Sequence, residues 1–79
     1  MARVLMFGAL AEVAGWREQT LEAGTLADLR ALLTEANPAL GERLSGPGVF
    51  AVVNKAMVRG DCVLAVDDEV GFVPPVSGG

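Results

Sequence analysis

Few residues of this chain carry side chains suited to acid–base or metal chemistry. The sequence has no His and no Tyr, one Cys (Cys62) and one Lys (Lys55). A His general base is therefore excluded, and so is a Cys/His metal site. The carboxylates of residues 67–69 are compatible with a metal or an acid–base role, but a solvated turn is the favoured interpretation. Cys62 begins the apolar run 62–66, which is typical of a small buried residue rather than of a persulfide site.

The other candidate for chemistry is the end of the chain, which reads Pro74-Pro75-Val76-Ser77-Gly78-Gly79. Proline fixes φ and donates no backbone hydrogen bond, so the two prolines should end a strand and give a stiff, extended exit. Residues 76–79 should then project from the body, over roughly 13 Å when extended. The last two glycines lack Cβ and could pass a narrow channel. A frayed end is the alternative for Gly-Gly alone, and the preceding proline pair favours a working tail.

Length and composition predict one small domain. The chain has 79 residues, 52% of them hydrophobic, and a net charge of −4. We expect a domain over residues 1–75 and a tail over residues 76–79. No basic cluster is present, which argues against nucleic acid as a partner. No segment approaches the roughly 20 apolar residues of a membrane helix, and a single Cys is typical of the reducing cytoplasm.

Hydrophobic periodicity predicts five strands and three helical segments. The strands are expected at 2–7, 16–22, 49–53, 57–58 and 69–73, and the helical segments at 9–14, 25–36 and 39–44. The best helix begins at Thr25, a good N-cap, with Asp28 favouring its positive end. Its core stripe is predicted to be Leu26, Leu29, Leu32, Leu33 and Ala36. Lys55 falls in the turn that joins the third and fourth strands, where we expect it to be solvated.

The order of these elements predicts an α+β domain. One main helix must cover one face of a mixed sheet. The first and last strands are the most apolar, which places them side by side in the centre of the sheet. With the helix as the crossover between the two halves, the fold class is a β-grasp, as in ubiquitin.

Alternation along the strands predicts a second apolar surface. Side chains of a strand point alternately to its two faces. The core face should hold Val4, Met6, Val70 and Phe72, and the opposite face Leu5, Phe7, Met57 and Val73. Because a helix layer covers only one face, we interpret the second set as an exposed surface that contacts a partner.

The final stretch resembles the family of molybdopterin synthase small subunits, which are ubiquitin-like sulfur carriers. The resemblance is carried by Asp-Glu-Val at 68–70, by Phe-x-Pro-Pro-Val-Ser at 72–77 and by the closing Gly-Gly. The opening residues 3–7, the Leu-rich helix and Val-Asn at 53–54 extend it over essentially the whole chain. Asp67 departs from the usual Gly, so the turn there must tolerate an Asp, as a left-handed conformation allows. Val73 replaces a common aromatic residue, and Gly71 predicts a close approach to the last strand.

The resemblance implies a cycle of chemistry at the Gly79 carboxylate. An E1-like adenylating enzyme uses MgATP to form the adenylate, and sulfur from a persulfide donor displaces AMP to leave a thiocarboxylate. The tail of Val76, Ser77, Gly78 and Gly79 then enters the large synthase subunit and donates sulfur to cyclic pyranopterin monophosphate. Two donations build the dithiolene of molybdopterin. Catalytic side chains are expected in the large subunit, with no cofactor and no metal bound by this chain.

The resemblance also implies partners and leaves alternatives open. The large subunit should contact Leu5, Phe7, Met57 and Val73 within a heterotetramer, and Lys55 could help in recognition. Sulfur carriers of thiamine, cysteine or tRNA-thiolation pathways also end in Gly-Gly. A ubiquitin-like modifier, joined to lysines through Gly79, is a further alternative. A plain interaction module with a frayed end is the simplest one.

Overall fold

The chain folds as a five-stranded sheet with three helices on one face. The computed structural model describes residues 1–75, so the predicted tail of Val76, Ser77, Gly78 and Gly79 lies outside the described residues. The elements run β1 (Ala2–Met6), α1 (Ala9–Ala14), β2 (Glu18–Leu21), α2 (Leu26–Ala36), α3 (Pro38–Leu44), β3 (Phe50–Val53), β4 (Ala56–Val58) and β5 (Glu69–Val73). The predicted elements are confirmed in type and order, and β2 is shorter than predicted.

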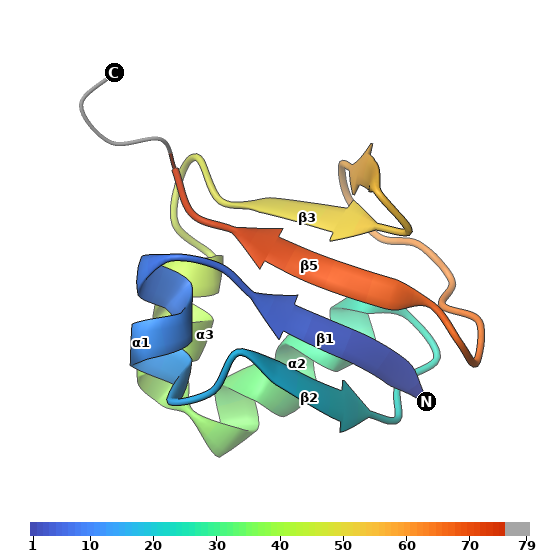
Figure 1. The fold of residues 1–79 in the computed structure, drawn as a ribbon, viewed down its shortest axis with the longest axis horizontal. Coiled ribbons are helices and arrows are strands. Elements are labelled where there is room, and N and C mark those ends of the chain that lie inside the picture. The colour runs from blue at the N-terminus through green and yellow to red at the C-terminus, as the bar shows by residue number, and fades with distance from the viewer. Residues whose placement is uncertain (76–79) are drawn as a thin grey trace.

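The sheet is mixed, with the first and last strands at its centre. Its order is β2-β1-β5-β3-β4. β1 and β5 are parallel, with Val4 opposite Val70, while β1–β2, β3–β4 and β3–β5 are antiparallel. Figure 1 shows the helices on one side of the sheet, leaving the other side uncovered. This is the predicted β-grasp arrangement.

The core lies between the sheet and the helices. Alternate residues of the central strands supply one half of it, including Val4, Met6, Val70 and Phe72, all of them buried. The helices supply the other half with Leu10, Leu26, Leu29, Leu33, Leu40 and Leu44. Burying each such side chain stabilises the fold by about 1.5–3 kcal/mol.

The predicted core stripe of α2 is wrong at two positions. Leu32 is 43% exposed, and Ala36 is also exposed. Successive residues turn by about 100° around a helix, which places Leu32 on the flank of the stripe rather than at its centre. Ala36 is the last residue of α2, where the stripe has already passed the edge of the core.

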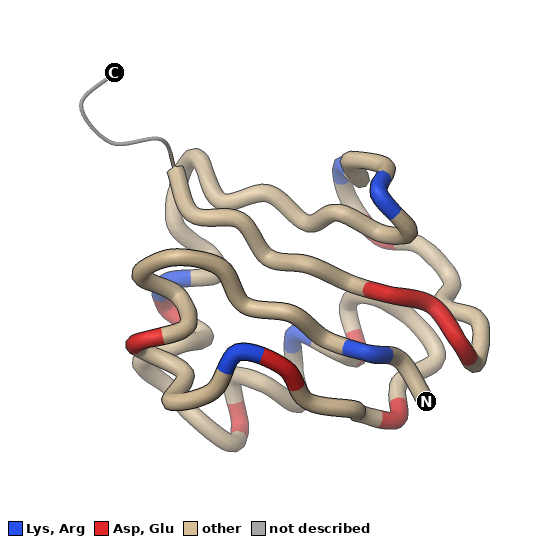
Figure 2. Tube along the Cα trace, in the orientation of Figure 1, with Lys and Arg blue, Asp and Glu red and all other residues tan. Residues whose placement is uncertain are grey.

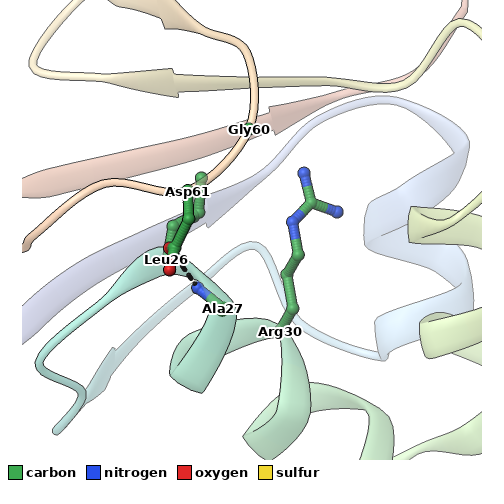
Figure 3. A pocket seen from close by; sticks show the side chains of 5 residues that line it. All are labelled: Leu26, Ala27, Arg30, Gly60 and Asp61. Atoms are coloured by element: carbon green, nitrogen blue, oxygen red, sulfur yellow. Dashed lines mark hydrogen bonds between the residues drawn. The ribbon is translucent and has the colours of Figure 1, made fainter.

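The first turn of α2 is hydrogen-bonded to residues 61 and 62, which are distant from it in sequence. The Thr25 hydroxyl accepts a hydrogen bond from the Asp28 amide at 3.1 Å, as predicted for an N-cap. Asp61 Oδ1 accepts from the Ala27 amide at 2.8 Å, and the Leu26 amide donates to the Cys62 carbonyl at 2.9 Å. These contacts satisfy amides that a helix cannot satisfy itself. Figure 3 shows Asp61 reaching the first turn of α2.

The end of α1 and the start of α3 are determined by single residues at those positions. α1 ends at Gly15, which has the left-handed φ of 85°, a conformation favoured by glycine. The Asn37 side chain accepts from the Leu40 amide at 3.1 Å to start α3 and donates to the Val13 carbonyl at 3.0 Å. Asn37 thereby joins α1 to α3. Among residues 1–75, no helix is both long and apolar enough to cross a membrane.

Candidate functional site

The last strand, β5, ends at the edge of the fold and is followed by two prolines. Val73, the final residue of β5, pairs with Phe50, and the Phe7 amide donates to the Phe72 carbonyl at 3.2 Å. Pro74 and Pro75 follow and cannot donate to a ladder. They lie beside the β1–α1 loop and the α3–β3 loop. A methyl group built at Gly8 would be 3.1 Å from Pro74 Cγ, and one built at Gly48 would be 2.7 Å from Pro75 Cβ.

A cavity lies next to this exit. It has a volume of about 600 Å³ and is lined by the proline pair and by residues of both loops and of α3, among them Gly8, Glu42, Arg43, Pro47 and Val49. The roles predicted for Pro74 and Pro75 in stiffening the exit remain predictions. Those for Val76, Ser77, Gly78 and Gly79 concern residues outside the described part of the chain.

The uncovered side of the sheet carries an apolar surface. We define the apolar face as Leu5, Phe7, Phe50, Val52, Met57 and Val73. Paired residues of neighbouring strands share a face, and Phe50 pairs with Val73 while Val52 pairs with Met57. Phe7, Phe50 and Met57 are 46%, 41% and 57% exposed, and the other three are partly exposed. The four predicted residues therefore do lie together on the uncovered side, and their contact with a partner remains a prediction.

Sequence reasoning missed Phe50 and Val52. The run Phe50-Ala51-Val52-Val53 is apolar throughout, so composition does not assign its faces. Residue size would have indicated the wrong face, because small Ala51 is buried while the larger Phe50 and Val52 face outward. Only the register against β5 fixes this choice.

Gly71 lets an aromatic ring lie flat on the sheet. A methyl group at Gly71 would be 2.9 Å from Phe7 Cε2, which confirms the predicted close approach to β5. The space between Leu5, Phe7, Val52 and Val73 is a shallow cavity of about 310 Å³. The apolar face is therefore indented beside the Phe7 ring, a shape suited to receive a side chain of a partner.

Charged residues border the apolar face at the other end of β1 and β5 and along the edge strand β2, where Glu18 lies opposite Leu5. Arg3 forms ion pairs with Glu18 at 3.2 Å and with Glu69 at 3.0 Å. Lys55, in the β3–β4 turn with a φ of 69°, borders the same cavity as Glu69. Figure 2 shows no charge on β1, β5 and β3 near their ends closest to the C-terminus. The apolar end of this side therefore adjoins the chain exit.

The carboxylates at 67–69 serve the fold. Asp68 accepts from Asn54 Nδ2 at 2.9 Å and from the Ala65 amide at 2.7 Å. The Asn54 side-chain bond, helped by the Ala65 amide, holds the pKa of Asp68 below its usual value. The predicted turn before β5 is present, since the Asp68 amide donates to the Ala65 carbonyl at 3.2 Å. Asp67 forms it without a left-handed conformation, because among non-glycine residues of the described chain only Asn54 and Lys55 have positive φ.

Other candidate groups lie away from the apolar face. Cys62 is partly buried against the core. A cavity of about 350 Å³ borders Arg30 and Asp61 at the start of α2, as seen in Figure 3. Arg30 donates to the Leu44 carbonyl at 3.2 Å, and Asp61 Oδ1 accepts from the Ala27 and Cys62 amides. Within residues 1–75, no three His, Cys, Asp or Glu side chains lie close enough together to hold a metal ion.

Comparison with known proteins gives a consistent set of relatives. The model of the ThiS family matches residues 4–79. The chain is 43% identical to the molybdopterin synthase sulfur carrier subunit of Chlamydomonas reinhardtii, over 98% of this chain and 96% of that protein. The crystal structure of SAMP1 from Haloferax volcanii superposes with a TM-score of 0.87 at 31% identity, covering 99% of this chain and 98% of that one.

A further solved structure is similar over nearly its whole length. It is the putative molybdopterin converting factor, subunit 1, of Pyrococcus furiosus, with a TM-score of 0.82 and 27% identity. The match covers 95% of this chain and 97% of that protein. These likenesses confirm the β-grasp fold class and the predicted kinship.

Proposed function

Because the chain belongs to the ThiS family, we propose that it is a sulfur carrier and the small subunit of a molybdopterin synthase. The observation that carries the proposal is its 43% identity, over nearly the whole of both chains, to a molybdopterin synthase sulfur carrier subunit. The apolar face beside the chain exit supports it, since a carrier must dock on the protein to which it delivers its group.

The proposed chemistry takes place at the main-chain carboxylate of Gly79. A carboxylate is a poor electrophile until a better leaving group is attached. An E1-like enzyme uses MgATP to convert it to an acyl adenylate, and pyrophosphate leaves. The terminal sulfur of a persulfide donor then attacks the acyl carbon, and AMP leaves, which joins Gly79 to the donor through an acyl disulfide. A thiol attacks the donor sulfur of this disulfide, so that the thiocarboxylate leaves and a disulfide forms on the donor. MgATP belongs to the activating enzyme in this scheme.

The thiocarboxylate then acts in the large subunit as the sulfur nucleophile. It donates its sulfur to cyclic pyranopterin monophosphate, and two such donations supply the dithiolene of molybdopterin. Acid–base groups come from the large subunit in this scheme, because this chain has no His and no Tyr to supply them. The small tail residues suit a narrow active-site channel, since Gly78 and Gly79 have no Cβ.

The apolar face is the proposed docking surface for the large subunit. Phe7 and Phe50 are half-exposed aromatic rings, a residue type that is enriched in the cores of protein interfaces. Docking there would place the partner next to the prolines from which the tail starts. The charged group around Arg3 would lie at the rim, where ion pairs tune recognition more than affinity.

A second candidate function is protein modification. The likeness to SAMP1, a small archaeal modifier protein, favours it. In that case a substrate lysine amine attacks the Gly79 adenylate or a thioester derived from it, and an isopeptide bond forms as AMP or the thiol leaves. Both functions share the first activation step, so they differ only in the acceptor.

Intact-mass measurement after activation tests the proposal. The protein is incubated with the E1-like enzyme, MgATP and a persulfide donor. We expect the mass increase for replacement of one oxygen by sulfur, and no increase without MgATP or in a variant lacking Gly79. An unchanged mass in the complete mixture, or an increase without Gly79, would contradict the carrier function.

The acceptor is tested by adding the large subunit and cyclic pyranopterin monophosphate. We expect loss of the sulfur mass together with formation of molybdopterin. Covalent attachment of the protein to lysine side chains, without transfer of sulfur to the pterin, would instead favour the modifier function. Loss of sulfur to a thiazole, cysteine or tRNA acceptor, with none to the pterin, would assign another pathway.

A further inference from the structure

The two prolines before the tail each lie against a glycine of another loop. Gly8 follows β1, and Gly48 precedes β3. A methyl group at Gly48 would be 2.7 Å from Pro75 Cβ, and one at Gly8 would be 3.1 Å from Pro74 Cγ. Carbon atoms in contact normally lie about 3.5–4.0 Å apart. Pro75 therefore approaches Gly48 more closely than a residue with a Cβ would allow, and Pro74 lies so near Gly8 that a Cβ there would displace it by a few tenths of an ångström.

Turn geometry alone does not account for this pairing. Gly8 and Gly48 have positive φ values of 56° and 83°, but so do Gly15 and Gly60, at 85° and 81°. A methyl group at Gly15 or Gly60 would meet no atom within 4 Å. Among these four glycines, the close approach is confined to the pair that touches the chain exit.

We propose that Gly8 and Gly48, the glycine pair, are positioning residues for sulfur transfer. They fix Pro74 and Pro75 and so set the point and direction at which the tail leaves the fold. This inference rests on the proposed carrier function. Neither glycine touches the reacting atoms, so they act through the prolines alone.

The need for such a device follows from the chemistry. The reacting group is a main-chain carboxylate, so no side-chain rotamer orients it, and its position depends on the path of the preceding residues. The last ladder partners of β5 are Val73 and Phe50, and the prolines donate no backbone hydrogen bond. Packing against the glycine pair replaces the missing ladder. Because Pro74 and Pro75 are held in place, the tail loses less conformational entropy when it enters an active site.

The decisive comparison is Gly48→Ala against Gly60→Ala. Both variants place a Cβ on backbone with almost the same positive φ, so both should lose thermal stability through strain. Only Gly48→Ala also displaces Pro75. At saturating large subunit, we expect the rate constant for sulfur transfer to fall about ten- to a hundredfold in Gly48→Ala. Gly60→Ala should transfer at the wild-type rate. KM for the carrier should be unchanged in both, because the apolar face is intact.

A double substitution tests whether the effect passes through Pro75. Pro75→Gly removes the Cβ that the new methyl group meets, so Gly48→Ala in this background should lower the transfer rate no further. A milder pair is Gly8→Ala against Gly15→Ala, since the contact is with the outer Cγ of Pro74. We expect a smaller loss in Gly8→Ala and none in Gly15→Ala. This pair decides the question should Gly48→Ala not fold.

The outcomes separate the inference from the function on which it rests. Wild-type protein that forms or transfers no sulfur contradicts the carrier function itself. Active wild-type protein with equal rates for Gly48→Ala and Gly60→Ala overturns the positioning role alone. A full additional loss from Gly48→Ala in the Pro75→Gly background also overturns it, since the effect would then not pass through Pro75.

Discussion

At the scale of single residues, Asn54 joins two turns that are distant in sequence. Its side chain donates to Asp68 at 2.9 Å and accepts from the Glu69 amide at 3.0 Å. Its own amide donates to the Glu69 carbonyl at 2.8 Å. Asn tolerates the left-handed φ of 50° found here better than most residues. Asn54 thus forms part of the β3–β4 turn and also holds the first residue of β5 in place.

The Asp68 carboxylate makes this joint sensitive to acid. Its pKa is lowered first by the Asn54 side chain and then by the Ala65 amide. The charged form therefore stabilises the folded state above the ordinary pKa of 3.8, and this stabilisation is lost as pH falls through the lower folded pKa. We expect Asp68→Asn to unfold at lower denaturant concentration than wild type at pH 7, and the difference to shrink below pH 3.8.

Asp67→Asn is the matched control for this prediction. Asp67 is exposed and its neighbour Asp68 makes the side-chain bonds of the turn. Denaturant titrations of both variants between pH 7 and pH 2 measure the effect. A difference between Asp68→Asn and wild type that stays constant over that range would show that the charge of Asp68 does not contribute.

At the scale of elements, β5 organises both surfaces of the sheet. Its Val70 and Phe72 point into the core, while Gly71 and Val73 contribute to the opposite side. The strict alternation of this strand made it predictable from sequence, and its predicted bounds are those observed. The same holds for α1, where Gly15 marks the end. Local patterns were sufficient where the hydrophobic periodicity and the glycine or proline residues at the ends of an element indicated the same bounds.

What local patterns did not predict depends on contacts between distant segments. Asp61 lies 34 residues from the Ala27 amide that it accepts from, and nothing near Asp61 indicates a helix cap. Phe50 faces outward because its register against β5 requires it. Gly48 and Pro75 meet only after the sheet forms. Periodicity also overstated the core stripe of α2 at Leu32, since a helix packed on a flat sheet buries a narrow strip.

The two layers give a matched test of the docking surface. Phe7 on the apolar face and Leu32 on α2 are 46% and 43% exposed, but they lie on opposite layers. We expect Phe7→Ala to raise the Kd for the large subunit about tenfold or more. Leu32→Ala should leave the Kd unchanged. Isothermal titration of both variants measures this, and equal effects would place the interface elsewhere.

At the scale of the whole molecule, the apolar face and the buried core lie on opposite sides of the sheet. The last buried side chain among residues 1–75 is Phe72. Arg3, Lys55 and Glu69 lie toward the end of the sheet opposite the chain exit, whereas Glu18 lies on the edge strand β2 opposite Leu5 of the apolar face. The apolar face lies beside the chain exit (Figures 1 and 2). A partner docked on it would therefore be next to the start of the tail, while the contacts that hold the fold together lie on the other face and in the turns.

This separation predicts that the tail is dispensable for folding but not for transfer. A chain ending at Pro75 keeps the described core, so its free energy of unfolding should stay within about 0.5 kcal/mol of wild type, as for changes outside a core. It also keeps the apolar face, so it should bind the large subunit and compete with the thiocarboxylated carrier. Steady-state molybdopterin synthesis at increasing truncated protein should show competitive inhibition. A truncated chain carrying Phe7→Ala should inhibit more weakly, and loss of folding on truncation would show that residues 76–79 belong to the structural domain.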